Sequence, residues 1–162
     1  MVLALPTLVA TAVGITGSCW WAGVTSGLSL LVVPAIAETA ADPRAAAQIW
    51  ASIYNRGAYW GPRMSSLIFL GLGYSAYDRS QRGASWAPYA VGGLLTLAVM
   101  PFTLGVMMPT NNALLAVAGG QKTLGAADVN GLLQKWKLLN NIRGLLPLAG
   151  SAIMLWDVIR QL

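Results

Sequence analysis

Long apolar stretches alternate with short polar connections along the chain, and this pattern predicts helices that cross a membrane. The first stretch has no charged residue before Glu38. Hydrophobic runs and turn signals predict helices over about residues 6–35, 61–78, 86–109 and 127–160. Because the uncharged window 64–77 is shorter than the roughly 20 residues that a crossing needs, the second helix is expected to extend past Arg63.

A short amphipathic segment is expected between the first two helices. Asp42 and Pro43 are typical of a helix cap and its first turn, and Trp50 and Tyr54 then share one helical face. Such a segment is expected to lie along the membrane surface. The prediction is an all-α protein, a transmembrane four-helix bundle that forms one domain over residues 1–162.

Glycines and prolines add local detail to this bundle. The spacing of Gly23 and Gly27 predicts a close contact between helices. The same spacing is compatible with self-association into a homo-oligomer. Pro101 and Pro147 are expected to kink the third and fourth helices.

Composition supports a membrane location and argues against several other classes. The chain is 56% hydrophobic and 9% charged, whereas soluble domains carry roughly a quarter charged residues. Its net charge of +5 is scattered rather than clustered, so the lipid bilayer is the expected partner and nucleic acid is not. Since the chain has no histidine, we expect no metal site and no haem.

Polar residues collect at the helix ends that an up-down-up-down bundle brings to one membrane face. These candidates are Ser29, Tyr54, Arg56, Thr103, Asn111, Trp136, Asn140 and Arg143. Trp136, Asn140 and Arg143 are separated by four and then three residues, so they lie on one face of a helix. An indole, an amide and a guanidinium could hold an aromatic molecule and stabilise an oxyanion. Anchoring at the membrane interface is the alternative for the same residues.

The residues of the third and fourth helices resemble a known family. The resemblance rests on Pro101–Thr103, Met108–Leu114 and the downstream Trp136, Asn140 and Arg143. These segments are similar to the anthrone oxygenase family, which includes the noranthrone and emodin-anthrone oxygenases of fungal polyketide pathways. The resemblance extends over nearly the whole chain.

The resemblance implies a cofactor-independent monooxygenase that converts an anthrone-type polyketide into an anthraquinone with molecular oxygen. It implies that Arg143, with Arg56 as a second candidate, stabilises the substrate anion or peroxide. Trp136 would stack on the ring system, while Asn111 and Asn140 would orient hydroxyl groups. Tyr54, Thr103 and Ser29 complete the expected substrate-binding set.

The proton acceptor is not determined by the sequence. Glu38 is the carboxylate expected on the same face as the candidate site, and water acting beside a cation is the alternative. A small transporter or channel subunit, or a non-catalytic membrane scaffold, remains an alternative function. The expected location is a multi-pass membrane protein, in the endoplasmic reticulum or a similar internal membrane if the source is eukaryotic.

Overall fold

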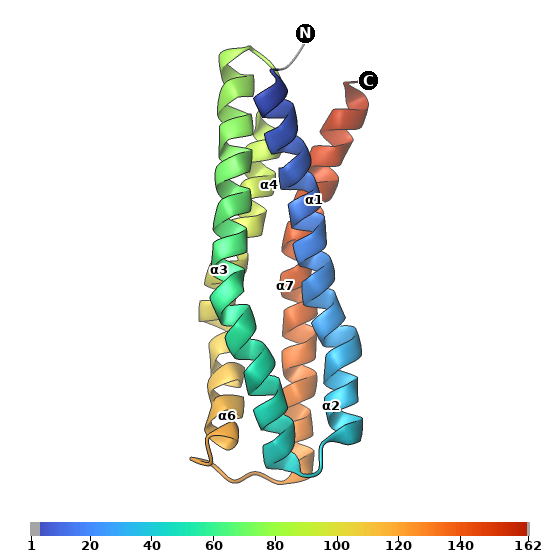
Figure 1. Ribbon diagram of the computed structural model, residues 1–162, viewed down its shortest axis with the longest axis vertical. Coiled ribbons are helices and arrows are strands. Elements are labelled where there is room, and N and C mark those ends of the chain that lie inside the picture. Colours follow the sequence, from blue (N-terminus) through green and yellow to red (C-terminus); the bar gives the residue numbers. More distant parts are fainter. Residues whose placement is uncertain (1–3, 162) are drawn as a thin grey trace. The chain divides into compact units, whose positions relative to one another are not determined.

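The computed structural model describes residues 4–161, which form four helical rods without any β-strand (Figure 1). The first rod contains α1 (Leu5–Gly27), the π-helix η1 (Leu28–Val32) and α2 (Val33–Thr39), and the second is α3 (Pro43–Gln81). The third rod contains α4 (Ala87–Leu97), α5 (Val99–Phe102), the π-helix η2 (Thr103–Met107) and α6 (Met108–Ala118), and the fourth is α7 (Ala126–Arg160). The predicted all-α class is confirmed. Residues 1–3 and 162 of the predicted domain lie outside the described residues.

Helix α3 is longer than the sequence predicted. The Asp42 carboxylate accepts a hydrogen bond from the Ala45 N–H at 2.8 Å, and Pro43 occupies the first turn, so the predicted cap is confirmed. The segment expected to lie separately along the membrane surface is the beginning of α3, and Pro62 lies inside the helix. The prediction of a separate start near residue 61 is therefore wrong, because the turns on either side of Pro62 continue the helix.

Prolines mark the irregular turns of the first and third rods. The π-helices η1 and η2 each end shortly before a proline, Pro34 and Pro109 respectively. A proline has no N–H to donate to the preceding turn, and in η1 the Val33 N–H reaches five residues back to the Leu28 carbonyl. Helix α4 ends at Leu97, four residues before Pro101, which cannot donate a hydrogen bond to that turn. The third rod then continues past Pro109, its predicted end, to Ala118.

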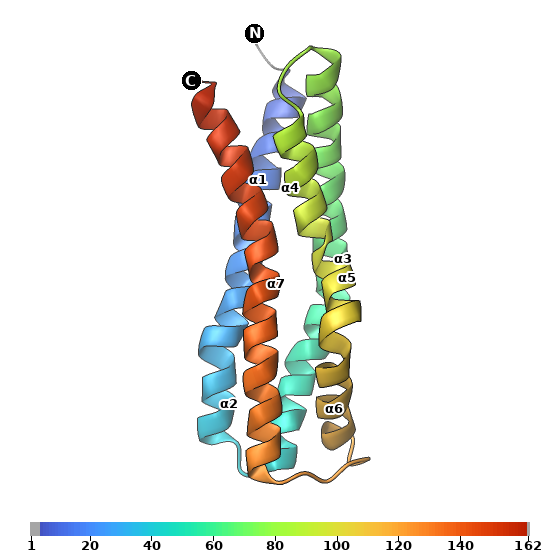
Figure 2. The same cartoon turned by 180° about the vertical axis from the view of Figure 1, so that it is seen from behind.

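The described chain forms two compact units. Unit 1 contains residues 1–23, 62–100 and 144–162, and unit 2 contains residues 24–61 and 101–143. Each unit includes a segment of every rod, so each is a small four-helix bundle. In unit 2, α6 lies beside the first half of α3 in both views (Figures 1 and 2). All the candidate site residues predicted from the sequence belong to unit 2.

Close helix packing in unit 1 depends on glycines that the sequence analysis did not single out. A Cβ atom on Gly150 would lie 2.9 Å from the Gly92 carbonyl oxygen and 3.1 Å from its Cα, so α4 and α7 touch backbone to backbone. By contrast, a Cβ on Gly23 or Gly27 would meet nothing within 4 Å. The predicted close contact at these two glycines is wrong, because spacing alone does not say which helix face meets a neighbour.

Gly150→Ala is expected to destabilise the protein by about 1–3 kcal/mol, because the new methyl group overlaps backbone that cannot move aside. Gly131→Ala is the matched control on α7, since a Cβ there meets nothing within 4 Å. This control should gain up to about 1 kcal/mol from helix propensity. Thermal unfolding in detergent measures both changes, and equal shifts of the two variants would contradict the backbone contact.

Three of the rods have the length and apolarity that a membrane crossing needs. They cover Leu5–Thr39, Ala87–Ala118 and Ala126–Arg160. Large apolar side chains such as Leu31, Leu67 and Leu104 are exposed on the surface, where a soluble protein would place polar groups. The described residues therefore have the surface of a membrane protein.

Candidate functional site

Asn140 on α7 is the centre of a buried hydrogen-bond network in unit 2. Its amide nitrogen donates to the Thr25 carbonyl oxygen at 2.7 Å and to Ser29 Oγ at 2.8 Å. Its amide oxygen accepts a hydrogen bond from Nη2 of Arg143. Asn140 is fully buried, so these three bonds hold its side chain in one orientation.

Arg143 follows Asn140 on the same helical face and carries a charge that no carboxylate neutralises. Its Nη1 donates to Thr103 Oγ1 at 2.9 Å, while its buried Nε–H has no partner among the described residues. No acidic side chain of residues 4–161 forms a salt bridge with it. Taking a charge out of water is costly unless it is compensated. The neutral side chains of Thr103 and Asn140 therefore orient this guanidinium. Its Nε–H is left as a donor for an anion or another acceptor oxygen.

Both hydroxyl groups that contact this pair come from π-helical turns. Ser29 belongs to η1, and Thr103 belongs to η2. A π-turn inserts a residue into a helix and rotates the following side chains, and such turns are frequent at functional sites. The irregular turns before Pro34 and Pro109 thus bring two distant hydroxyls to Asn140 and Arg143.

Aromatic side chains form a second group in unit 2. The ring of Trp50 stacks on Tyr54 with a centroid distance of 5.0 Å, and Trp136 meets Trp50 edge to face at 5.8 Å. Trp136 is only 3% exposed and packs in the apolar core of the unit. It has no open face for a substrate in this conformation, so its predicted stacking role stays a prediction.

Tyr54 links the aromatic group to α6. Its hydroxyl donates to Met108 Sδ at 3.8 Å, and the Asn111 amide nitrogen donates to the same sulfur at 3.9 Å. Asn111 is fully buried, and its amide oxygen has no partner among the described residues.

Four buried polar atoms of unit 2 lack a hydrogen-bond partner among residues 4–161. They are Nε1 of Trp50, Nε1 of Trp136, Nε of Arg143 and Oδ1 of Asn111. Buried polar atoms in native proteins are usually paired, so each orphan requires an explanation. Three of these orphans are donors and one is an acceptor.

Two predicted site residues do not join this cluster. Glu38 and Arg56 are exposed, and neither forms a hydrogen bond or ion pair with it in the described structure. Each stands two positions from a residue that faces inward, Ile36 or Tyr54, and two positions on a helix point to nearly opposite sides. The sequence analysis missed Trp50 as a site residue, although its spacing of four from Tyr54 is a usable signal.

Metal-ligating side chains do not gather anywhere in the described part of the chain. No group of three or more histidine, cysteine or acidic residues there has a geometry that could hold an ion.

Comparison with known proteins identifies relatives along most of the chain. Residues 50–153 match the family described as anthrone oxygenase. The chain is 37% identical to the monooxygenase hypC of Dothistroma septosporum over 81% of this chain and 72% of that protein. It is 34% identical to the anthrone oxygenase tpcL of Aspergillus fumigatus over 94% and 93%, respectively. It is also 32% identical to the noranthrone monooxygenase of Aspergillus flavus, over 86% and 68%. No solved structure matches the chain.

Proposed function

Because the chain belongs to the anthrone oxygenase family, we propose that it oxidises an anthrone-type aromatic polyketide to the corresponding anthraquinone with molecular oxygen. Relatives named anthrone oxygenase or noranthrone monooxygenase cover most of its length. The transporter, channel and scaffold alternatives gain no support from these relatives.

The reaction balances with oxygen as the only oxidant. The anthrone loses a proton from the methylene carbon of its central ring and becomes an extended phenolate-like anion. This anion passes one electron to oxygen, and the resulting radical pair combines into a peroxide at that carbon. Loss of the second ring hydrogen as a proton, with cleavage of the O–O bond, leaves a ketone and releases water. One oxygen atom thus enters the product and the other becomes water.

Arg143 is the residue on which this proposal mainly depends. Its unneutralised charge and unpartnered Nε–H suit the oxyanion of the deprotonated anthrone and then the peroxide. Asn140 and Thr103 orient the guanidinium without cancelling its charge. The amide oxygen of Asn111 would accept a substrate hydroxyl, and the two indole N–H groups would donate to substrate oxygens.

Under this proposal the substrate supplies the electrons, so the chain needs no cofactor of its own. Proton removal is assisted by Arg143, because a nearby cation favours the ionised form of the substrate. We propose water as the proton acceptor, since Glu38 is exposed and forms no hydrogen bond with the cluster.

A multi-pass location in an internal membrane would suit this chemistry. Planar polyketides are poorly soluble in water and partition into lipid, and the exposed apolar side chains of the helices face such a medium. The substrate would then approach unit 2 from the bilayer.

Oxygen uptake tests the proposal directly. The purified chain in detergent is given 1,8-dihydroxyanthrone and air, and quinone absorbance is followed beside oxygen consumption. We expect both to rise together, well above the spontaneous rate. Equal rates with and without the protein would refute the proposed activity.

Trp50→Phe and Trp136→Phe are each expected to lower the turnover number roughly tenfold, because they remove an indole N–H while keeping a ring in the core. The exposed Trp60 lies on α3 in the same unit, and Trp60→Phe is the matched control with unchanged turnover. Steady-state oxygen uptake at saturating anthrone measures the three variants. Wild-type turnover in Trp50→Phe would reduce that indole to a packing role.

A further inference from the structure

The exposed side chains of α7 change character part of the way along the helix. Before Leu138 they include Asp128, Asn130, Gln134 and Lys135. From Leu138 to Trp156, by contrast, every exposed residue is apolar. This apolar stretch is about 27 Å long at about 1.5 Å per residue, close to the roughly 30 Å of the hydrocarbon core of a bilayer. The whole helix has 35 residues and a length of about 52 Å, which exceeds that thickness even at the usual tilts.

Helix α3 shows the same change. Its exposed residues before Gly57 are mostly polar and comprise Arg44, Gln48, Ile49, Ser52, Asn55 and Arg56. After Arg63 they comprise Leu67, Leu70, Gly73, Tyr74 and Tyr77. The exposed rings of Tyr59 and Trp60 lie between the two stretches, and such aromatic residues are enriched where a membrane meets water. About 26 Å of helix separates Trp60 from Tyr77.

The apolar surfaces of the other rods end at one level of unit 2. Toward the polar ends, their last large exposed apolar residues are Leu31 on the first rod, Val106 on the third and Leu138 on α7. Each of these lies within three residues of Ser29, Thr103 or Asn140, which the hydrogen bonds of Asn140 and Arg143 connect. The three rods therefore change from apolar to polar surface beside the same hydrogen-bond network.

Aromatic and basic side chains flank the apolar stretches. Arg56 and Lys135 are exposed on the polar side of the change in unit 2. At the other ends of the stretches, Trp86 and Trp156 are exposed, and Arg82 and Arg160 lie four residues away from them. Phosphate groups of phospholipids attract such cations, and tryptophans favour the same interfacial layer.

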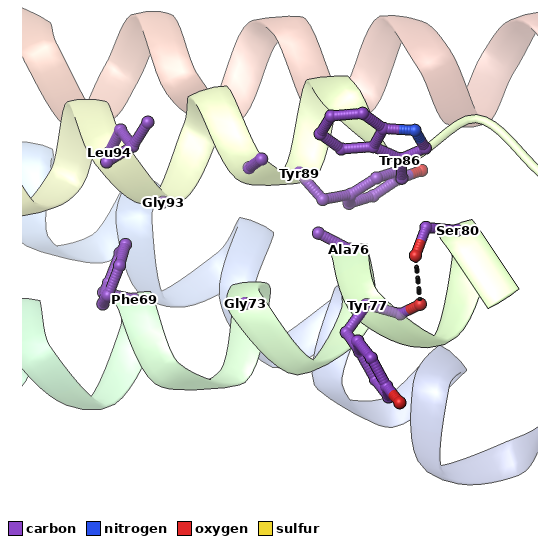
Figure 3. A pocket seen from close by; sticks show the side chains of 10 residues that line it. Phe69, Gly73, Ala76, Tyr77, Ser80, Trp86, Tyr89, Gly93 and Leu94 are labelled. Atoms are coloured by element: carbon purple, nitrogen blue, oxygen red, sulfur yellow. Dashed lines mark hydrogen bonds between the residues drawn. The ribbon is translucent and has the colours of Figure 1, made fainter.

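An open groove between α3 and α4 lies within the apolar stretches (Figure 3). Its walls include Phe69, Ala76 and Leu94, which present carbon atoms. The hydroxyl of Ser80 at its edge donates to the Tyr77 carbonyl oxygen at 2.7 Å, so it is already engaged. Lipid acyl chains match such walls, because they cover carbon without requiring a polar partner.

We propose that bilayer hydrocarbon surrounds the apolar stretches of all four rods, α3 included, and that its boundary lies within unit 2. The boundary crosses the first rod at Leu31, the third at Val106 and α7 at Leu138. On α3 it lies between Arg56 and Trp60, and the long side chain of Arg63 reaches the headgroups from about 4.5 Å beyond Trp60. The beginnings of α3 and α7 then stand among headgroups and in water.

This boundary passes through the candidate site. Arg143 lies five residues past Leu138, which places it about 7 Å inside the hydrocarbon, whereas Trp50 and Trp136 lie on the polar side. Apolar anthrone and oxygen would reach the guanidinium from the lipid, and the released proton would have a short path to water. This consequence rests on the proposed function, while the boundary rests on the exposed residues alone.

Spin labels on single cysteines test the boundary in vesicles of phosphatidylcholine and phosphatidylglycerol. The background is Cys19→Ser, and the labelled positions are exposed, with Ser52→Cys and Leu70→Cys on α3 and Gln134→Cys and Leu148→Cys on α7. Collisions with oxygen, which dissolves in hydrocarbon, are compared with collisions with a water-soluble nickel chelate. The oxygen-to-nickel ratio should be roughly tenfold higher at Leu70 and Leu148 than at their partners on the same helix.

Each outcome supports or overturns the boundary. Equal ratios at Ser52 and Leu70, or at Gln134 and Leu148, would overturn it, because hydrocarbon or water would then cover both halves of the helix alike. Nickel-dominated collisions at Leu70 would remove α3 from the membrane and also overturn it. The expected ratios in a chain without oxygen uptake would support the boundary and reject the proposed function. An active chain with uniform ratios would do the reverse.

Discussion

Replacing Arg143 by alanine is expected to lower the turnover number for anthrone oxidation by roughly 10² or more. Hydrogen bonds to Thr103 and Asn140 orient the Arg143 guanidinium in unit 2. Both partners are neutral, so the positive charge is not cancelled. Its removal withdraws stabilisation from the negative charge that forms on the substrate and then on the peroxide. Oxygen uptake at saturating anthrone measures the loss.

A pH profile separates this electrostatic role from a structural one. Without the cation, the substrate ionises at higher pH, so the rate profile of Arg143→Ala should move upward along the pH axis. Arg143→Lys keeps the charge but loses the planar fork that reaches Thr103 and Asn140, and it should recover part of the rate. The exposed Lys135 on α7 is the control cation, and Lys135→Ala should behave as wild type. Full activity in a folded Arg143→Ala variant would return Arg143 to the role of a membrane anchor.

Local sequence rules predicted the features of the site that depend on one helix alone. The spacing of three between Asn140 and Arg143 places them on one face, and they are hydrogen-bonded to each other. The cap at Asp42 is likewise a short-range arrangement, which explains why it could be predicted.

The sequence could predict which residues of different rods lie in the same region, but not which of their atoms contact each other. Ser29 and Thr103 were expected near Asn140 and Arg143, but their hydrogen bonds depend on the π-turns η1 and η2. A π-turn changes the direction in which the following side chains point. A proline downstream favours such a turn but does not fix its position. The sequence alone therefore could not define the partner atoms.

Burial was the least predictable property. Trp50 was assigned to a surface segment, yet it lies in the core of unit 2 and contacts Trp136. Both faces of this part of α3 carry apolar or aromatic residues, so periodicity does not reveal which face is buried. The same ambiguity explains why Arg56 was expected beside Tyr54, although the two point to nearly opposite sides.

Asn140→Leu is expected to destabilise the chain by about 2–4 kcal/mol and to reduce turnover at the same time. Leucine has a similar size, but it removes the donors to Thr25 and Ser29 and the acceptor for Arg143. The guanidinium then keeps its charge and loses its orientation. The neighbouring Asn141 provides the control, since it makes none of these bonds, and Asn141→Leu should change stability by less than about 0.5 kcal/mol.

Asn140→Asp separates orientation from charge at the same position. The carboxylate can still accept from Arg143, but it no longer donates to Thr25 and Ser29, and its negative charge cancels the cation that the substrate anion needs. We therefore expect a folded variant whose turnover falls about as far as that of Arg143→Ala, measured by thermal unfolding beside oxygen uptake. High activity in Asn140→Asp would mean that the positive charge of Arg143 does not act on the substrate. Equal stability of Asn140→Leu and Asn141→Leu would mean that the buried network contributes nothing to folding, because only Asn140 makes these hydrogen bonds.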